Sequence, residues 1–283
     1  MSENARAVIA RRLHEPVAVP DDAFTICAIS AVSAMLANVL HEGVGHGLIA
    51  LASGAHSGVL NTVAWSSAFD SRLVEAGGTL VNLLAGLVFW ITLRRARGAS
   101  LPARYFLLTS CALNLFTGTG YFFFSGVSDF GDWAQVIAGL HPHGLWRALL
   151  VIFGIAGYYG AVRMVGAGLV HNIGVPLDQH RRWRRLTLLP YVTAIVLLGV
   201  AGLRNQLGIQ YVWLSALPAS AGADSGLLWM RYYLPTRTVP DRAAEALPRS
   251  YAWLALAAVL IFAYIFVLGR GVTLYAYSHS AAR

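Results

Sequence analysis

Long apolar stretches separated by short polar ones recur along the whole chain. A helix needs about 20 apolar residues to cross the roughly 30 Å hydrocarbon core of a bilayer. Six stretches approach that length, and they cover residues 23–53, 76–93, 105–124, 148–162, 186–203 and 251–268. The pattern therefore predicts an all-α polytopic protein with about six transmembrane helices.

Two further stretches depart from this simple pattern. Residues 208–234 are moderately apolar but are broken by Pro218, Gly222 and Asp224, which favours an interfacial or re-entrant segment over a span. Residues 56–65 alternate as a strand does, which predicts a short membrane-associated β-hairpin after the first helix, with an ordinary loop as the alternative. An edge strand there could hold an unwound substrate by backbone pairing.

These stretches divide the chain into three parts. Residues 1–22 form a cytoplasmic N-terminal segment, and residues 23–140 form a transmembrane core that carries the candidate chemistry described below. Residues 141–283 add further helices, with a long loop at about 204–249. No heptad array indicates a coiled-coil partner.

Composition and charge agree with a membrane location. The chain is 57% hydrophobic and 12% charged, so it has too little polar surface to cover a soluble globule of its size. Its positive charges are arginines that cluster between apolar stretches, which argues against a nucleic-acid surface. Arginines at 6–12, 94–104 and 181–185 fall on one side, which we expect to be cytoplasmic in a bacterial inner membrane, although those within 204–249 do not fit.

Three ionisable residues lie together in the first apolar stretch. His41, Glu42 and His46 form the motif HExxxH, and such groups are costly inside a membrane unless they face an interior site. Zinc proteases use HExxH, in which two histidines on one helix face bind Zn²⁺ and the glutamate acts on water. The motif here is one residue longer.

The extra residue changes the expected helix geometry. Five steps of about 100° leave the two histidines roughly 140° apart on a regular α-helix. A π-bulge would bring them back to one face, and Gly43 and Gly45 remove steric obstacles to it. On a regular helix, Glu42 and His46 would instead form the metal pair, or both histidines would serve only as hydrogen-bonding groups.

The order of motifs resembles the site-2 protease family of intramembrane zinc metalloproteases. The histidine motif is followed by the small-residue run Ala76-Gly77-Gly78-Thr79-Leu80-Val81-Asn82-Leu83-Leu84-Ala85, and then by Asn114 and Ser128-Asp129-Phe130-Gly131-Asp132-Trp133. The resemblance covers roughly the first half of the chain. It implies a zinc endopeptidase in which Glu42 is the general base and His41, His46 and an aspartate bind Zn²⁺.

The third ligand is a choice between two aspartates. The family's ligand is an aspartate beside glycine, so we assign Asp132, which follows Gly131 and begins a helical-looking run. Asp129 is the alternative and is expected to cap or orient. His141 and His143 are more distant candidates for auxiliary ligands. Cys27 and Cys111 fall in apolar helices and are expected to be buried thiols.

The leading hypothesis is therefore hydrolysis of peptide bonds in transmembrane or juxtamembrane segments of membrane proteins. One alternative is an inactive relative that binds membrane proteins and acts as a regulator. Another is a membrane zinc amidase or lipid hydrolase, which would share the metal but would need no substrate-pairing strand.

Overall fold

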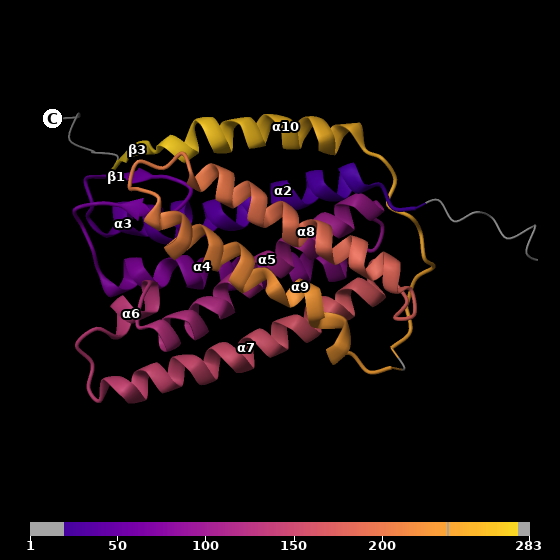
Figure 1. The fold of residues 1–283 in the computed structure, drawn as a ribbon, viewed down its shortest axis with the longest axis horizontal. Helices are drawn as coiled ribbons and strands as arrows, with labels where there is room; N and C mark the ends of the chain where they lie inside the picture. Colours follow the sequence, from indigo (N-terminus) through magenta and orange to yellow (C-terminus); the bar gives the residue numbers. More distant parts are fainter. Residues whose placement is uncertain (1–19, 237, 277–283) are drawn as a thin grey trace, which may run out of the picture.

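The computed structural model describes residues 20–236 and 238–276, and most of the predicted N-terminal segment lies outside that range. The protein is mostly helical, at 72%, and its described residues contain six helices long and apolar enough to span a membrane. The first span, Ala23–Ser53, consists of α2 (Ala23–Val39), η1 (Leu40–Leu48) and α3 (Ile49–Ser53). The next four are α4 (Arg72–Arg95), α5 (Leu101–Ser128), α7 (His143–His171) and α8 (His180–Gly202). The last, Tyr251–Arg270, consists of α10 (Tyr251–Phe266) and η6 (Leu268–Arg270). The six predicted helices are confirmed (Figure 1).

Several helices are longer than their apolar stretches. Helix α7 has 29 residues where the apolar pattern indicated 148–162, because polar residues flank that stretch on both sides, namely His143, Arg147, Arg163 and His171. Polar residues can continue a helix beyond an apolar core, since its backbone bonds are internal and its side chains reach water. Hydropathy therefore located all six helices and matched the bounds of residues 23–53, but it shortened several of the others.

Residues 208–234 were expected to form an interfacial or re-entrant segment in place of a span, and the structure places no helix long enough to cross a membrane among these described residues. The segment consists of short π, 3₁₀ and α pieces: η2 (Val212–Ala216), η3 (Pro218–Gly222), η4 (Ala223–Ser225), α9 (Gly226–Trp229) and η5 (Met230–Tyr233). It runs the length of the bundle (Figure 1). Near its start, the Ser215 hydroxyl donates a hydrogen bond to Val63 O beside the β-strands. Near its end, Leu234 lies beside Gly166 of α7, toward the opposite end of the bundle. Helices α8 and α10 run in the same direction (Figure 1), so the segment between them must carry the chain back along the bundle.

This return also accounts for the position of two arginines in the loop of residues 204–249, Arg242 and Arg249. Arg182 pairs with Asp21, and Arg249 pairs with Asp22, so both lie at the N-terminal end of α2. Arg242 donates to Arg97 O in the loop between α4 and α5. Arg242 and Arg249, which did not fit the charge pattern, therefore lie at the same end of the bundle as the basic segments 94–104 and 181–185.

A small antiparallel sheet lies beside the end of the first long helix. Strands β1 (Ser57–Leu60) and β2 (Trp65–Ser66) form the predicted hairpin, and β3 (Val272–Tyr275) pairs with the other side of β1. The order is β2-β1-β3, so β1 is a central strand and its edge is not free for substrate. The all-α prediction omitted β3, because four alternating residues some 200 positions away give no local sign of their partner.

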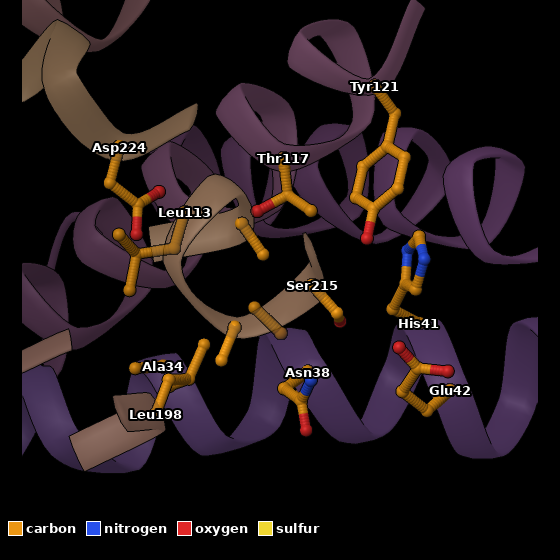
Figure 2. Close-up of a pocket in the computed structure, with 13 residues that line it drawn as sticks. Ala34, Asn38, His41, Glu42, Leu113, Thr117, Tyr121, Leu198, Ser215 and Asp224 are labelled. Carbon is orange, nitrogen blue, oxygen red and sulfur yellow. The ribbon is translucent and has the colours of Figure 1, made fainter. Parts of the chain in front are cut away.

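A narrow cavity of about 20 Å³ lies inside the bundle. It is bordered by α2, η1, α5, α8 and the η2–η4 segment, and it extends along α2 from Ala34 to Glu42 (Figure 2). The candidate chemistry of the first helix therefore faces an internal space within the bundle.

Candidate metal centre

The histidine motif lies on a π-helix, as the one-residue insertion predicted. Residues Leu40–Leu48 form a continuous π-helical segment, η1, between the α-helical α2 and α3. An i to i+5 turn returns His46 to the face of His41, and the two ring centroids lie 4.8 Å apart. The regular-helix alternative, in which Glu42 and His46 form the pair, does not occur.

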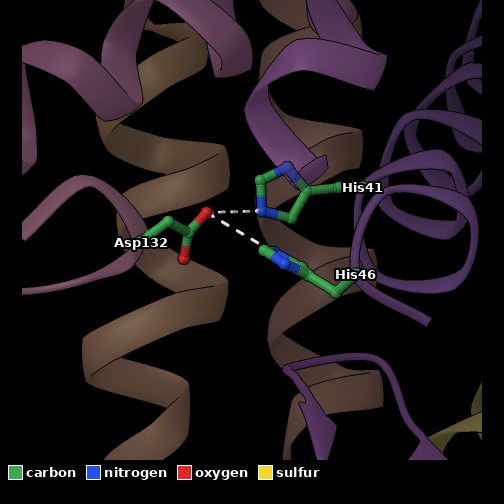
Figure 3. A group of neighbouring side chains, drawn as sticks. All are labelled: His41, His46 and Asp132. Atoms are coloured by element: carbon green, nitrogen blue, oxygen red, sulfur yellow. Dashed lines mark ion pairs between the residues drawn. The ribbon is translucent and has the colours of Figure 1, made fainter. Parts of the chain in front are cut away.

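Helix α6 (Asp132–Ile137) brings the third residue to the histidines. Asp132 Oδ2 lies 3.2 Å from His41 Nε2 and 3.4 Å from His46 Nε2 (Figure 3). One ligand atom from each of the three residues lies within 4.8 Å of the others. Gly131, with φ of 84°, makes the turn that aims Asp132 inward at the first residue of α6.

The other candidate ligands lie elsewhere. Asp129 is the left-handed C-cap of α5, and its carboxylate contacts His143 Nε2 at 3.0 Å and Arg147 Nη1 at 3.6 Å. His141 lines a surface pocket with Asp129 and His143. The structure thus brings Asp132 to His41 and His46, and it does not bring Asp129, His141 or His143 into that group.

The hydrogen bonds of the rings indicate a cation-binding arrangement. His41 Nδ1 lies 2.6 Å from Asn82 Oδ1, and His46 Nδ1 lies 2.8 Å from Val74 O. Both partners are acceptors, so in neutral rings each Nδ1 carries the proton and each Nε2 offers a lone pair. These lone pairs face the carboxylate of Asp132, and three acceptors at such distances need positive charge between them, supplied by a metal ion or by protons on the rings.

Two spacings among the candidate ligand atoms can be compared with those around a tetrahedral metal ion such as Zn²⁺. Tetrahedral Zn²⁺ with bonds of about 2.0–2.2 Å holds neighbouring ligand atoms about 3.3 Å apart. The distances from Asp132 Oδ2 to the two Nε2 atoms, 3.2 and 3.4 Å, match this value. His41 Nε2 and Asp132 Oδ2 are also buried without a hydrogen-bond partner among the described residues, as unliganded metal ligands would be.

The Asp132 side chain is held in its ionised form, which is the form that binds a metal ion. Burial alone would raise the pKa of its carboxyl, but hydrogen bonds and positive charge from the protonated rings of His41 and His46 lower it well below its usual range. The side chain is therefore an anion, and an ionised carboxylate binds a divalent cation.

Asn82 of the small-residue helix α4 fixes the His41 ring. Its amide nitrogen donates to Ala37 O at 3.0 Å and to Asn114 Oδ1 at 2.8 Å, so its oxygen must face His41. Groups that orient a ligand in this way typically contribute 10- to 100-fold to metal affinity. Asn82 and Asn114 both belong to the motifs singled out in the sequence, although their mutual contact was not predicted.

We expect Asn82→Ala to weaken zinc binding by about 10- to 100-fold, because His41 loses the acceptor that selects its tautomer. Competition against a chelator of known affinity measures the change. Thr79→Val is the matched control, since Thr79 is buried on the same helix and its hydroxyl has no partner among the described residues. Equal affinity in the two variants would contradict this role for Asn82.

Glycines in η1 and α4 allow the two helices to approach at the metal centre. A Cβ on Gly45 would collide with the backbone of Gly78. A Cβ on Gly78 would lie 2.7 Å from His41 Nε2 and closer still to His46 Nε2. Gly45 and Gly78 are therefore required because η1 and α4 approach each other closely at these positions.

We expect Gly78→Ala to prevent zinc binding, because the added methyl group would occupy the space between the two Nε2 atoms. Zinc content after purification measures this loss. Gly160→Ala is the control, since it lies within α7 and a Cβ added there would meet nothing within 4 Å. Zinc bound at wild-type levels in Gly78→Ala would show that this close approach is not essential.

Glu42 lies next to the three ligands but is not one of them. Its Oε2 accepts a hydrogen bond of 3.0 Å from the backbone N–H of Trp65 in β2, and its side chain faces the internal cavity. Tyr121 of α5 stacks on His41 with ring centroids 4.7 Å apart. Sequence reasoning missed both contacts, because each joins residues distant in the chain with no shared motif.

Comparison with protein-family models, curated proteins and solved structures returned no match for this chain. The arrangement of the three ligands and Glu42 therefore carries the functional argument.

Proposed function

We propose that this chain is a multi-pass membrane zinc metalloprotease that hydrolyses peptide bonds within or beside the bilayer. The observation that carries the proposal is the separation of Asp132 Oδ2 from the two histidine Nε2 atoms, which matches tetrahedral zinc. The six apolar helices support a location within a bilayer. The motif order resembles the site-2 protease family, and membership in that family is part of the proposal.

Each residue has a distinct role in this proposal. His41, His46 and Asp132 hold the metal, which when bound supplies Lewis acidity and lowers the pKa of water. Glu42 accepts a proton from the attacking water and passes it to the leaving amine, so one water is consumed for each bond broken. The Trp65 amide positions the Glu42 carboxylate for this transfer.

An inactive binding protein would not need Glu42 in this position. Its carboxylate is buried beside the three ligands and has no basic side chain as its hydrogen-bond partner among the described residues. Burying a carboxylate is costly, and a purely structural metal site gains nothing from it. The arrangement therefore favours an enzyme.

A membrane zinc amidase or lipid hydrolase is the second candidate. A mainly apolar cavity of about 640 Å³ lies between α5, α7 and the η2–η5 segment. It shares Tyr121 and Ala219 with the small cavity at Glu42, and it is large enough for a lipid chain. The pairing of β1 with β3 also covers the edge of β1, so that β2 and β3 are the edge strands of this sheet.

Purified full-length protein in bicelles, incubated with zinc, separates these functions. The proposal predicts cleavage of fluorogenic transmembrane peptides, its loss with a zinc chelator and its return when zinc is added. Cleavage of lipid amides in place of peptides would favour the second candidate. Hydrolysis of neither substrate by zinc-loaded protein would contradict an enzymatic function.

A further inference from the structure

Asp224 is a buried carboxyl group that the proposed reaction does not use. It lies in η4, it is 3% exposed, and its Oδ1 has no hydrogen-bond partner among the described residues. Leaving such a group without a partner is unfavourable, so each case in a native protein needs an explanation. A buried water molecule that satisfies the group is one such explanation.

The side chain lines the same cavity as Glu42. Asp224 lies toward one end of this cavity, and His41 and Glu42 lie toward the other (Figure 2). Ala34 and Glu42 are eight positions apart along the continuous helix of α2 and η1, which corresponds to about 12 Å. The cavity is therefore long and narrow, and it links the unpartnered carboxyl to the proposed general base.

The size and lining of the cavity suit water. A cavity needs about 10–15 Å³ to hold one water molecule, and this one has about 20 Å³. Asn38, Thr117 and Ser215 offer polar atoms between its two ends. No arginine is among the described residues that line the cavity, so a cationic side chain does not neutralise Asp224 there.

We propose that Asp224 maintains a bound-water site in this cavity, and that its water replaces the molecule consumed at Glu42 in each turnover. The second half of this inference rests on the proposed hydrolytic function. The remaining lining includes Ala34, Leu113, Leu198 and Ala219, and apolar cavities of this kind stay dry. Asp224 supplies the polar group that makes hydration favourable.

Hydroxyl-radical footprinting by X-ray radiolysis tests the hydration directly, because bound water raises labelling of adjacent side chains. In the full-length protein without added metal, we expect Leu113 and Leu198 to be labelled faster than Leu169, which is buried away from the cavity. Asp224→Leu should abolish this difference, whereas Asp224→Asn should retain it. Equal labelling of the three leucines in wild type, or unchanged labelling in Asp224→Leu, would overturn the inference.

Two further measurements separate hydration from a structural role. Asp224→Leu should unfold at the same temperature as wild type or higher, because the cost of burying a carboxyl group is removed. Ala219→Val, which fills the cavity without changing Asp224, should also reduce labelling of the two leucines. A lower unfolding temperature in Asp224→Leu, with labelling intact in Ala219→Val, would assign Asp224 a structural role and overturn the inference.

The kinetic consequence is tested separately. If peptides are hydrolysed, Asp224→Leu should lower kcat about fivefold with KM unchanged, the rate equivalent of one lost hydrogen bond. An unchanged kcat would reject the water-replacement step. Absence of hydrolysis by wild type would reject the proposed function and that step, while the footprinting result would still decide whether the cavity is hydrated.

Discussion

Glu42→Gln is expected to reduce hydrolysis by at least about 100-fold while leaving zinc bound. General acid–base groups typically contribute 10²- to 10⁴-fold, and glutamine cannot accept the proton from water. Zinc should remain because Glu42 is not among the three ligands, and the glutamine oxygen can still accept the bond from the Trp65 amide. Turnover and zinc content should be measured on the same preparation.

Glu245→Gln is the control for Glu42→Gln, because the Glu245 side chain is 69% exposed and pairs only loosely with Arg104 at 4.0 Å. Its turnover should equal that of wild type. Undiminished turnover in Glu42→Gln would remove Glu42 from the mechanism. Loss of zinc together with turnover would instead assign Glu42 to metal binding.

Asp132→Ala is expected to lose zinc and activity together, whereas Asp129→Ala should retain most of the metal. Asp132 Oδ2 faces both histidine Nε2 atoms, so its removal leaves only two protein ligands. Asp129 instead pairs with His143 and Arg147 near the surface. Each purified variant should be analysed for zinc content and for peptide hydrolysis.

The paired design makes Asp129→Ala the control, since both aspartates lie in the same connection between α5 and α7. Stoichiometric zinc in Asp132→Ala, with metal lost from Asp129→Ala, would reverse the assignment of the third ligand. Loss of zinc from both variants would show that the whole connection must be intact for binding.

Features set by local pattern were predictable from the sequence. Apolar length alone located the six long helices, because a helix satisfies its own backbone wherever the stretch is long enough. The five-residue spacing of His41 and His46 predicted the π-helix, since only that geometry returns both rings to one face. Gly131 beside Asp132 correctly favoured Asp132 over Asp129 as the residue that reaches the histidines.

Features set by distant contacts were not predictable in this way. The partner of β3 is β1, more than 200 residues earlier, and neither strand contains a sign of the other. The contact of Trp65 with Glu42 likewise depends on how the hairpin folds back onto η1. Asp224 was interpreted as a break in an apolar stretch, because its burial follows from the return of η2–α9 through the bundle.

The zinc content of the purified protein tests the central claim most directly. Elemental analysis of wild-type protein should find about one zinc per chain, as expected for a site with three protein ligands and an open position. His41→Ala and His46→Ala, purified in parallel as folded proteins, should each contain little or none. Zinc-free wild-type protein that stays empty after incubation with the metal, or full zinc content in both variants, would contradict the account.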